Sequence, residues 1–187
     1  MTQQGKNAID LVLAESLIEL SVKKPIDKIT IKEITDKAGV IRPTFYNHFQ
    51  DKYELIEWII KTELLEPIKP LLNAGMIFEA IVLMLNNISA NSVFYKKALK
   101  LEGAVTFNQI AMKCVYEMFM NIINEKSTGK KSKYRWLTPE VISTYYAQSL
   151  CFITEGWIAQ GMDDIEPKEM AEAYMYLITR SMDDILS

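Results

Sequence analysis

Helix-breaking residues are rare in this chain, and their scarcity limits the folds that it can adopt. Only seven glycines and six prolines occur in 187 residues, whereas 49% of the residues are hydrophobic. A strand-rich fold needs frequent turns, and glycine and proline are prominent in turns. Apolar residues recur at helical spacing between the few breakers. The sequence therefore predicts an all-α protein of about nine helices.

The first helix is expected from about Asn7 to Lys23, where Pro25 prevents its continuation. Helical spacing predicts that its buried side chains are Ile9, Val12, Leu13, Leu17 and Leu20. Its solvent-facing side chains are expected to be Asp10, Glu15 and Glu19. This pattern describes an amphipathic helix with one face against a small core.

Two short helices are predicted next, on either side of Gly39. Thr30-Ile31-Lys32-Glu33 has the pattern of a capping box, which begins the earlier helix. Gly39 ends that helix because glycine tolerates a left-handed turn. The later helix is expected over Arg42 to His48, and Asp51 begins a fourth helix that extends toward Pro67. Short helices joined in this way indicate a helix-turn-helix from about Thr30 to Phe49.

The later of these two helices has side chains suited to reading DNA. Phe45 and Phe49 lie one turn apart and are expected to pack inward, which leaves the opposite side open. The residues expected on that side are Arg42, Pro43, Thr44, Tyr46 and Asn47. An arginine fork matches guanine, an asparagine amide matches adenine, and Thr or Tyr can reach a phosphate or a thymine methyl. His48 and Lys52 flank the next helix N-terminus, where a phosphate is favoured.

These residues carry a resemblance to a known family. The segment Ile29 to Val40, followed by Thr44-Phe45-Tyr46-Asn47-His48-Phe49 and Asp51-Lys52, resembles the DNA-binding region of the TetR/AcrR family. The resemblance covers about residues 8–55 and implies that Thr30 and Lys52 contact phosphate, and that the recognition helix contributes Arg42, Thr44, Tyr46, Asn47 and His48. It also implies a homodimer, reversible binding to operator DNA and an effector cavity between the middle helices. The sequence departs from the family at Ile41, where a Ser or Thr cap is more common, and at Pro43, where a small residue is usual.

The rest of the chain predicts a second, larger helical domain. Helices are expected at about 76–90, 93–101, 104–125, 138–160 and 167–185, where Thr138-Pro139 and Pro167 begin the last two. We place the DNA-binding domain at residues 1–53 and the ligand-binding and dimerisation domain at residues 54–187.

The last two helices are apolar around more of their circumference than one buried face requires, which indicates a partner subunit. The residues expected at this dimer interface are Tyr145, Tyr146, Phe152, Ile153, Tyr174, Leu177, Ile178 and Met182. The candidate effector residues are mostly core side chains that could also line a cavity, together with two polar ones. They are Met84, Asn108, Met112, Tyr116, Phe119, Glu155 and Trp157.

Two further features are expected to serve the fold. Cys114 and Cys151 lie in apolar helical patterns without CxxC spacing, as buried small hydrophobes do. The basic run of Lys126, Lys130, Lys131, Lys133 and Arg135 has the composition of a solvated loop, with an anionic effector or a second DNA contact as the alternatives.

Other function classes have less support. The net charge of −3 argues against non-specific coating of nucleic acid. The single histidine excludes a histidine metal cluster, and no Ser/His/Asp set or Gly-rich phosphate loop occurs, so we expect no enzyme, cofactor or metal. No signal peptide or run of 18 apolar residues occurs, so a cytoplasmic protein without membrane association is expected.

The function predicted from the sequence is sequence-specific transcription regulation at a near-palindromic operator of double-stranded DNA. Repression relieved by a small-molecule effector is the first hypothesis. The alternatives are a co-activator or partner-dependent regulator that binds DNA weakly alone, and a ligand-binding or adaptor protein that has lost DNA contact.

Overall fold

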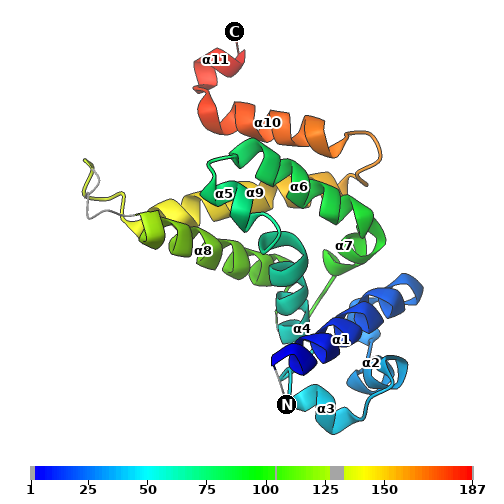
Figure 1. The fold of residues 1–187 in the computed structure, drawn as a ribbon. Coiled ribbons are helices and arrows are strands. Elements are labelled where there is room, and N and C mark those ends of the chain that lie inside the picture. Colours follow the sequence, from blue (N-terminus) through cyan, green and yellow to red (C-terminus); the bar gives the residue numbers. More distant parts are fainter. Residues whose placement is uncertain (1–2, 104, 127–132, 187) are drawn as a thin grey trace.

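The computed structural model describes residues 3–103, 105–126 and 133–186, which contain eleven α-helices and no strand (Figure 1). A 3-10 turn, η1 (Ile26–Lys28), follows the first helix, and a π-helical segment, η2 (Ile60–Leu65), continues the fourth. The α-helices are α1 (Gln3–Lys23), α2 (Ile31–Ala38), α3 (Arg42–Tyr46), α4 (Lys52–Ile59), α5 (Lys69–Asn73), α6 (Ile77–Ala90), α7 (Ser92–Ala98), α8 (Phe107–Lys126), α9 (Pro139–Ala159), α10 (Pro167–Thr179) and α11 (Met182–Leu186).

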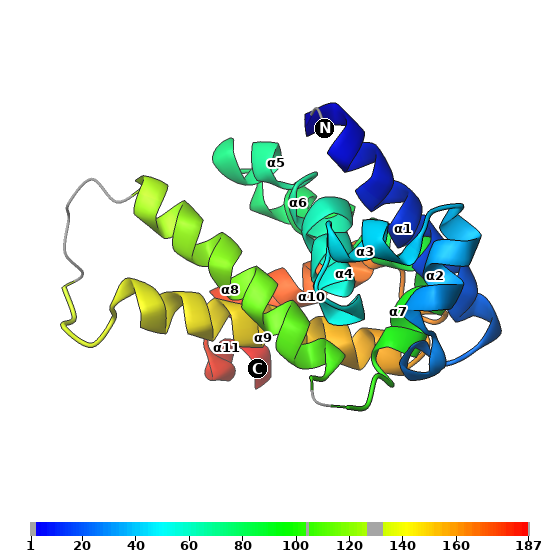
Figure 2. The same ribbon diagram turned by 90° about the horizontal axis from the view of Figure 1, so that it is seen from below.

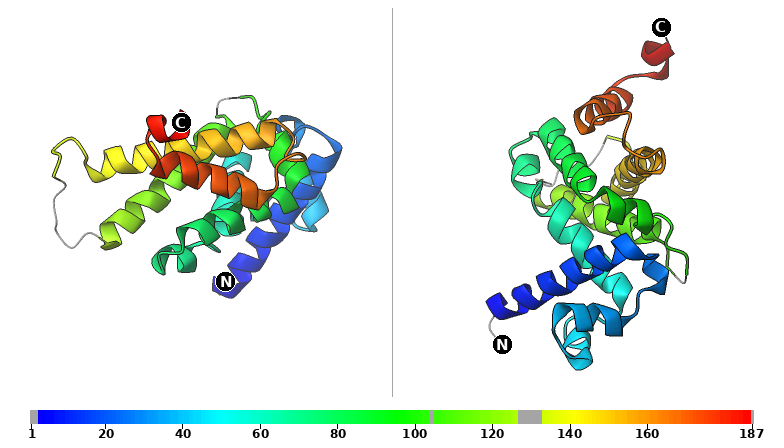
Figure 3. Two further views of the ribbon diagram at one scale, coloured as in Figure 1. Left: turned by 90° about the horizontal axis from the view of Figure 1, so that it is seen from above. Right: turned by 90° about the vertical axis from the view of Figure 1, so that its right-hand side faces the viewer.

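The helices form a small N-terminal head and a larger helical body. Helices α1, α2 and α3 make the head, and α4 connects it to the body (Figure 1). In the body α8 packs along α9, while α10 crosses α6 at the end of the molecule opposite α3 (Figures 2 and 3). The two ends of the described chain therefore lie at opposite ends of the molecule. The predicted boundary at residues 53 and 54 falls in the first turn of α4, which contacts both α1 and α8.

The buried stripe of α1 differs from the predicted one. The buried residues of α1 are Asp10, Leu13, Ala14, Ser16, Leu17 and Ser21, and the helix contacts α2, α4 and α7. Val12 was expected in this stripe, but 40% of its surface is exposed. Asp10 was expected in solvent, and it is 6% exposed. The buried face of α1 is therefore rotated from the predicted one. A carboxylate is buried only where it is paired, and the apolar pattern of α1 does not reveal a partner elsewhere in the chain.

That partner is the single histidine of the chain. The His48 Nδ1–H donates to Asp10 Oδ1 over 2.6 Å, and their side chains are 2% and 8% exposed. Because both side chains are buried, water cannot take the place of either partner in this bond. The bond therefore fixes the end of the α3 segment against α1.

Helix α4 continues without a break into η2, whose backbone is wider than an α-helix. The Glu66 amide donates to the Lys61 carbonyl, five residues earlier, over 2.8 Å. The amide of Asn87 on α6 donates to the Glu63 carbonyl over 2.9 Å. The fourth helix therefore extends toward Pro67 as predicted, but its last part is π-helical.

The C-terminal helix was predicted as one element and is two. Arg180 is extended, and the Ser181 hydroxyl accepts a hydrogen bond from the Asp184 amide while the Asp184 carboxylate accepts one from the Ser181 amide. This reciprocal cap begins α11. Helix α5 was not predicted, and α8 begins at Phe107 rather than near Ala104, which lies outside the described residues.

Both cysteines are buried small side chains, as predicted. Burial raises the pKa of each thiol to about 12. Within the described ranges no single helix is long and apolar enough to cross a membrane; α6 and α7 meet that length and composition test only as a pair bent by 88°.

The Asp10–His48 bond predicts a specific loss of stability. Asp10→Ala should lower the free energy of unfolding by about 1–3 kcal/mol, because it leaves a buried imidazole N–H without an acceptor. Urea denaturation followed by circular dichroism measures the change. Glu15→Ala, at an exposed position of the same helix, should change it by less than about 0.5 kcal/mol. Equal effects of the two substitutions would show that the bond contributes nothing.

Candidate nucleic-acid interface and effector cavities

The helix-turn-helix begins with the predicted capping box. The Thr30 hydroxyl accepts from the Glu33 amide, and the Glu33 carboxylate accepts from the Thr30 amide over 2.9 Å. The Lys24 ammonium also donates to Glu33 over 2.5 Å. The lysine and the two Thr30 donors together lower the pKa of Glu33 to about 2. Thr30 is exposed, so it can approach a phosphate, but its hydroxyl also holds the start of α2.

Gly39 makes the turn between α2 and α3. Its φ of 69° is in the left-handed region that favours glycine, and the following amide, of Val40, donates back to the Thr35 carbonyl over 3.0 Å. Ile41 then precedes α3 in an extended conformation without a side-chain cap. Pro43 lies in the first turn of α3, where a missing backbone N–H costs no helical bond. The two departures from the family pattern therefore leave the helix intact.

Helix α3 presents the predicted polar side. Phe45 and Phe49 are buried beneath it, whereas Tyr46 is 48% exposed. Arg42, Pro43 and Asn47 are exposed too, and Thr44 is half-buried. The Arg42 guanidinium donates to the Tyr46 hydroxyl over 3.0 Å and lies 5.5 Å from the centre of its ring. This contact orders the long Arg42 side chain on the open side of α3.

Ile41 is an exposed residue that sequence reasoning did not include in the site. It is 69% exposed beside the first turn of α3, which is unusual for a large aliphatic side chain. An aliphatic group there suits contact with a thymine methyl in the major groove. The only sequence signal was its departure from the usual polar cap.

Two of the predicted phosphate contacts have side chains that the head itself engages. His48 is buried against Asp10. The Lys52 ammonium donates to the carbonyl oxygens of Ile26, Asp27 and Ile29 at 3.0, 2.7 and 3.3 Å. Burial lowers the pKa of Lys52, although nearby Asp27 opposes that effect. Both side chains therefore brace the head, and neither is free for phosphate in this conformation.

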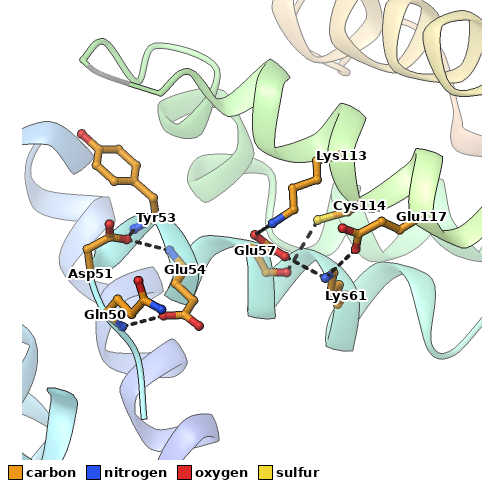
Figure 4. Close-up of polar contacts among 9 residues, drawn as sticks. All are labelled: Gln50, Asp51, Tyr53, Glu54, Glu57, Lys61, Lys113, Cys114 and Glu117. Carbon is orange, nitrogen blue, oxygen red and sulfur yellow. Dashed lines mark hydrogen bonds and ion pairs between the residues drawn. The ribbon is translucent and has the colours of Figure 1, made fainter. Parts of the chain in front are cut away.

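An ionic chain joins α4 to α8 where the head meets the body (Figure 4). Glu57 accepts from Lys61 over 2.7 Å and from Lys113 over 2.8 Å, and Lys61 pairs with Glu117 as well. Burial raises the pKa of Glu57, but its two lysine donors outweigh burial, so the pKa is lowered. The chain borders a polar cleft of about 400 Å³ between α4 and α8, whose lining includes Tyr53 and Gln109.

The body contains two apolar cavities. The larger cavity, of about 390 Å³, lies among α5, α6, α8, α9 and α10, and the smaller cavity, of about 50 Å³, lies next to η2. Of the predicted effector residues, Met84 lines both cavities and Phe119 lines the larger one. Asn108 and Glu155 line the smaller cavity, and the Asn108 amide donates a hydrogen bond to the Glu155 carboxylate over 2.5 Å. Met112, Tyr116 and Trp157 line neither, and the Trp157 indole N–H donates to the Ile165 carbonyl over 2.9 Å.

The predicted dimer residues divide between the surface and the core. Tyr145 and Phe152 on α9 are 61% and 76% exposed, and Leu177 and Met182 are also exposed. Tyr146 is 37% exposed and packs on Phe119. The remaining residues belong more to the core: Ile153 and Ile178 are half-buried, and Tyr174 is 3% exposed. Tyr174 is unsuited to an interface because its ring fills space between α10 and the larger cavity.

The basic run predicted after α8 is only partly described. Lys126 is the last residue of α8 and lines the larger cavity, while Lys133 and Arg135 are exposed. Lys130 and Lys131 lie outside the described residues.

A braced helix-turn-helix with an open second helix, attached to a helical body, defines a DNA-binding regulator of transcription. Comparison with known sequences identifies the family. The profile described as "Bacterial regulatory proteins, tetR family" matches residues 15–59, and the TetR profile described as "Transcriptional regulator C-terminal region" matches residues 76–180. The chain therefore belongs to the TetR family of transcription regulators.

Individual relatives share this fold. The HTH-type dhaKLM operon transcriptional activator DhaS of Lactococcus lactis subsp. lactis (strain IL1403) is 26% identical over 152 residues, which cover 80% of this chain and 79% of DhaS. A solved structure of the dihydroxyacetone kinase operon activator DhaS is 21% identical, with a TM-score of 0.64 over 91% of this chain and 93% of that one. NalD, the secondary repressor of the MexAB-OprM multidrug efflux pump in Pseudomonas aeruginosa, is 12% identical, with a TM-score of 0.60 over 92% of this chain and 96% of its own.

The contacts of Lys52 predict that its loss affects stability more than DNA contact. Lys52→Met should lower the free energy of unfolding by about 1–3 kcal/mol, because three carbonyl oxygens lose a charged donor. Thermal and urea unfolding measure the effect. Lys28→Met, at an exposed lysine nearby, is the matched control and should be nearly neutral. An unchanged stability with weaker DNA binding would instead establish Lys52 as a phosphate contact.

Proposed function

We propose that this protein is a homodimeric regulator that binds a near-palindromic operator through α3. The observation that carries the proposal is the open side of α3, where Arg42, Tyr46 and Asn47 are exposed while Phe45 anchors the helix. Direct base contacts come from Arg42, Asn47 and Tyr46, with Ile41 and Thr44 beside them and Thr30 toward the phosphates. His48 and Lys52 hold this surface in place.

The dimer forms through the exposed apolar face of α9 and α10. Tyr145 and Phe152 lie two turns apart on α9, and Gly156 and Ala159 continue the same stripe with small side chains that permit close approach of a partner helix. Tyr176 and Leu177 on α10 are 45% and 46% exposed. Such a two-fold contact sets two copies of α3 on successive major-groove faces of the operator.

A small-molecule effector bound in the body changes operator affinity by favouring one arrangement of the two heads over another. Repression by occlusion is the first proposal, and an effector that favours the other arrangement would release the operator. Activation is the second proposal, and it is favoured by the similarity to DhaS, which is named as a transcriptional activator. The protein has no catalytic role in either case, and it acts in the cytoplasm, where operator DNA is found.

Selection of random duplex DNA by the purified protein tests operator binding. The wild type should enrich a near-palindrome, and Tyr46→Ala should bind that site about tenfold or more weakly, because it loses a groove contact and the support for Arg42. Tyr46→Phe, which keeps the ring, is the matched control and should lose less. No enrichment by a folded wild-type dimer would contradict operator binding without a second protein.

A reporter under the selected operator distinguishes the two directions of regulation. Deleting the regulator should raise transcription if it represses and lower it if it activates.

The dimer face predicts its own test. Phe152→Glu should convert the dimer to a monomer at micromolar concentration, because it places a charge in the centre of an apolar contact. Light scattering coupled to size-exclusion chromatography measures the mass. Trp136→Ser removes an aromatic that is 74% exposed and lies outside α9 and α10, and it should leave the dimer intact. A dimer that survives Phe152→Glu would move the interface to another face.

A further inference from the structure

We propose that the larger cavity binds an amphipathic anion, with its apolar part among α6, α8, α9 and α10 and its charged group at Lys126. This inference rests on the proposed effector role of the body and names the chemical class of the effector. The cavity of about 390 Å³ is within the usual range for small-molecule sites.

The lining of the larger cavity suits the apolar part of the proposed ligand. Apolar and aromatic side chains make up the lining except for Lys126, which is the only charged residue among those described around the cavity. Met84, Met118 and Met175 are flexible side chains that can adjust to the shape of a hydrocarbon. Such a surface takes a hydrocarbon chain or ring system.

Lys126 suits the anionic group of the proposed ligand. Its ammonium donates to the Leu72 carbonyl over 3.0 Å, which places the charge between the end of α8 and α5 at the edge of the cavity. No carboxylate of the described residues forms an ion pair with it. Among the described residues that line the cavity, Lys126 is therefore the one group that can attract an anion. The ammonium retains N–H groups for an anion.

The smaller cavity is the wrong site for such a ligand. Its volume of about 50 Å³ is too small for a drug-sized molecule, and Glu155 would repel an anion there. Charge and size therefore both favour the larger cavity.

Calorimetric titration of the full-length protein without DNA tests this inference with three ligands that share one tail: decanoate, decanol and decyltrimethylammonium. Decanoate should bind most tightly and the cation most weakly. Between octanoate and decanoate, affinity should rise about fourfold per added methylene while the cavity still has room. Equal affinity for the anion and the cation would overturn the assignment of charge.

Two substitutions locate the ligand. Lys126→Gln should weaken decanoate about fivefold to tenfold and leave decanol unchanged, because only the anion loses a charged donor. Lys133→Gln, at an exposed lysine of the same run, is the matched control and should change neither. Ile123→Trp, at a half-buried position of the lining, should abolish binding of all tails by filling the cavity.

The failures of the two proposals are distinguishable. A protein that selects an operator but does not bind decanoate overturns only this inference, as does decanoate binding that is insensitive to both Lys126→Gln and Ile123→Trp. Decanoate binding that depends on these residues, in a protein that selects no operator, supports the cavity and contradicts the operator proposal.

Discussion

The continuous helical segment formed by α4 and η2 joins the head to the body, and its contacts at both ends determine how the two are placed. At its N-terminus Lys52 holds the turn before α2 through three backbone carbonyls. In its middle Glu57 and Lys61 join α8 through Lys113 and Glu117. At its end Ile60, Leu64 and Leu65 form part of the wall of the smaller cavity. A movement of α8 against this segment therefore acts directly on the element that carries the head.

Polar groups that are distant in sequence pair around the apolar core of the head and tie its elements together. Asp10 and His48 join α1 to the end of the α3 segment, and Lys24 ties Glu33 to the residues after α1. These contacts leave the short α3, which has few helical bonds of its own, with a fixed position. In the proposed operator-binding role, a helix that is already ordered loses less conformational entropy on contact with DNA.

The features that depend only on neighbouring residues were predictable from the sequence. The Thr30 capping box, the turn at Gly39 and the start of α9 at Thr138-Pro139 were all predictable, because each is complete within about four residues. The reciprocal cap of Ser181 and Asp184 had the same kind of local signal and was overlooked within a long apolar pattern.

The features that the sequence could not supply depend on packing between distant elements. Nothing next to Asp10 indicates that its partner is 38 residues away, and nothing near Lys52 indicates that carbonyl oxygens of η1 surround it. Each cavity is assembled from five helical segments, so single residues such as Met112 and Tyr116 could not be assigned to one from periodicity. The family pattern supplied residue positions, whereas the fold decided which side chains remain free.

The ion pairs within the head affect how strongly the protein is expected to bind DNA of arbitrary sequence. Lys24, Lys28, Lys32 and Lys37 each lie against a carboxylate of the head itself. A phosphate that approaches one of these lysines exchanges one anion for another, so part of the usual counterion gain is lost. In the proposed operator complex, this exchange lowers the affinity for arbitrary sequence and leaves a larger share of the affinity to base contacts of α3. In that complex, the ratio of specific to non-specific affinity increases because the non-specific affinity is lowered.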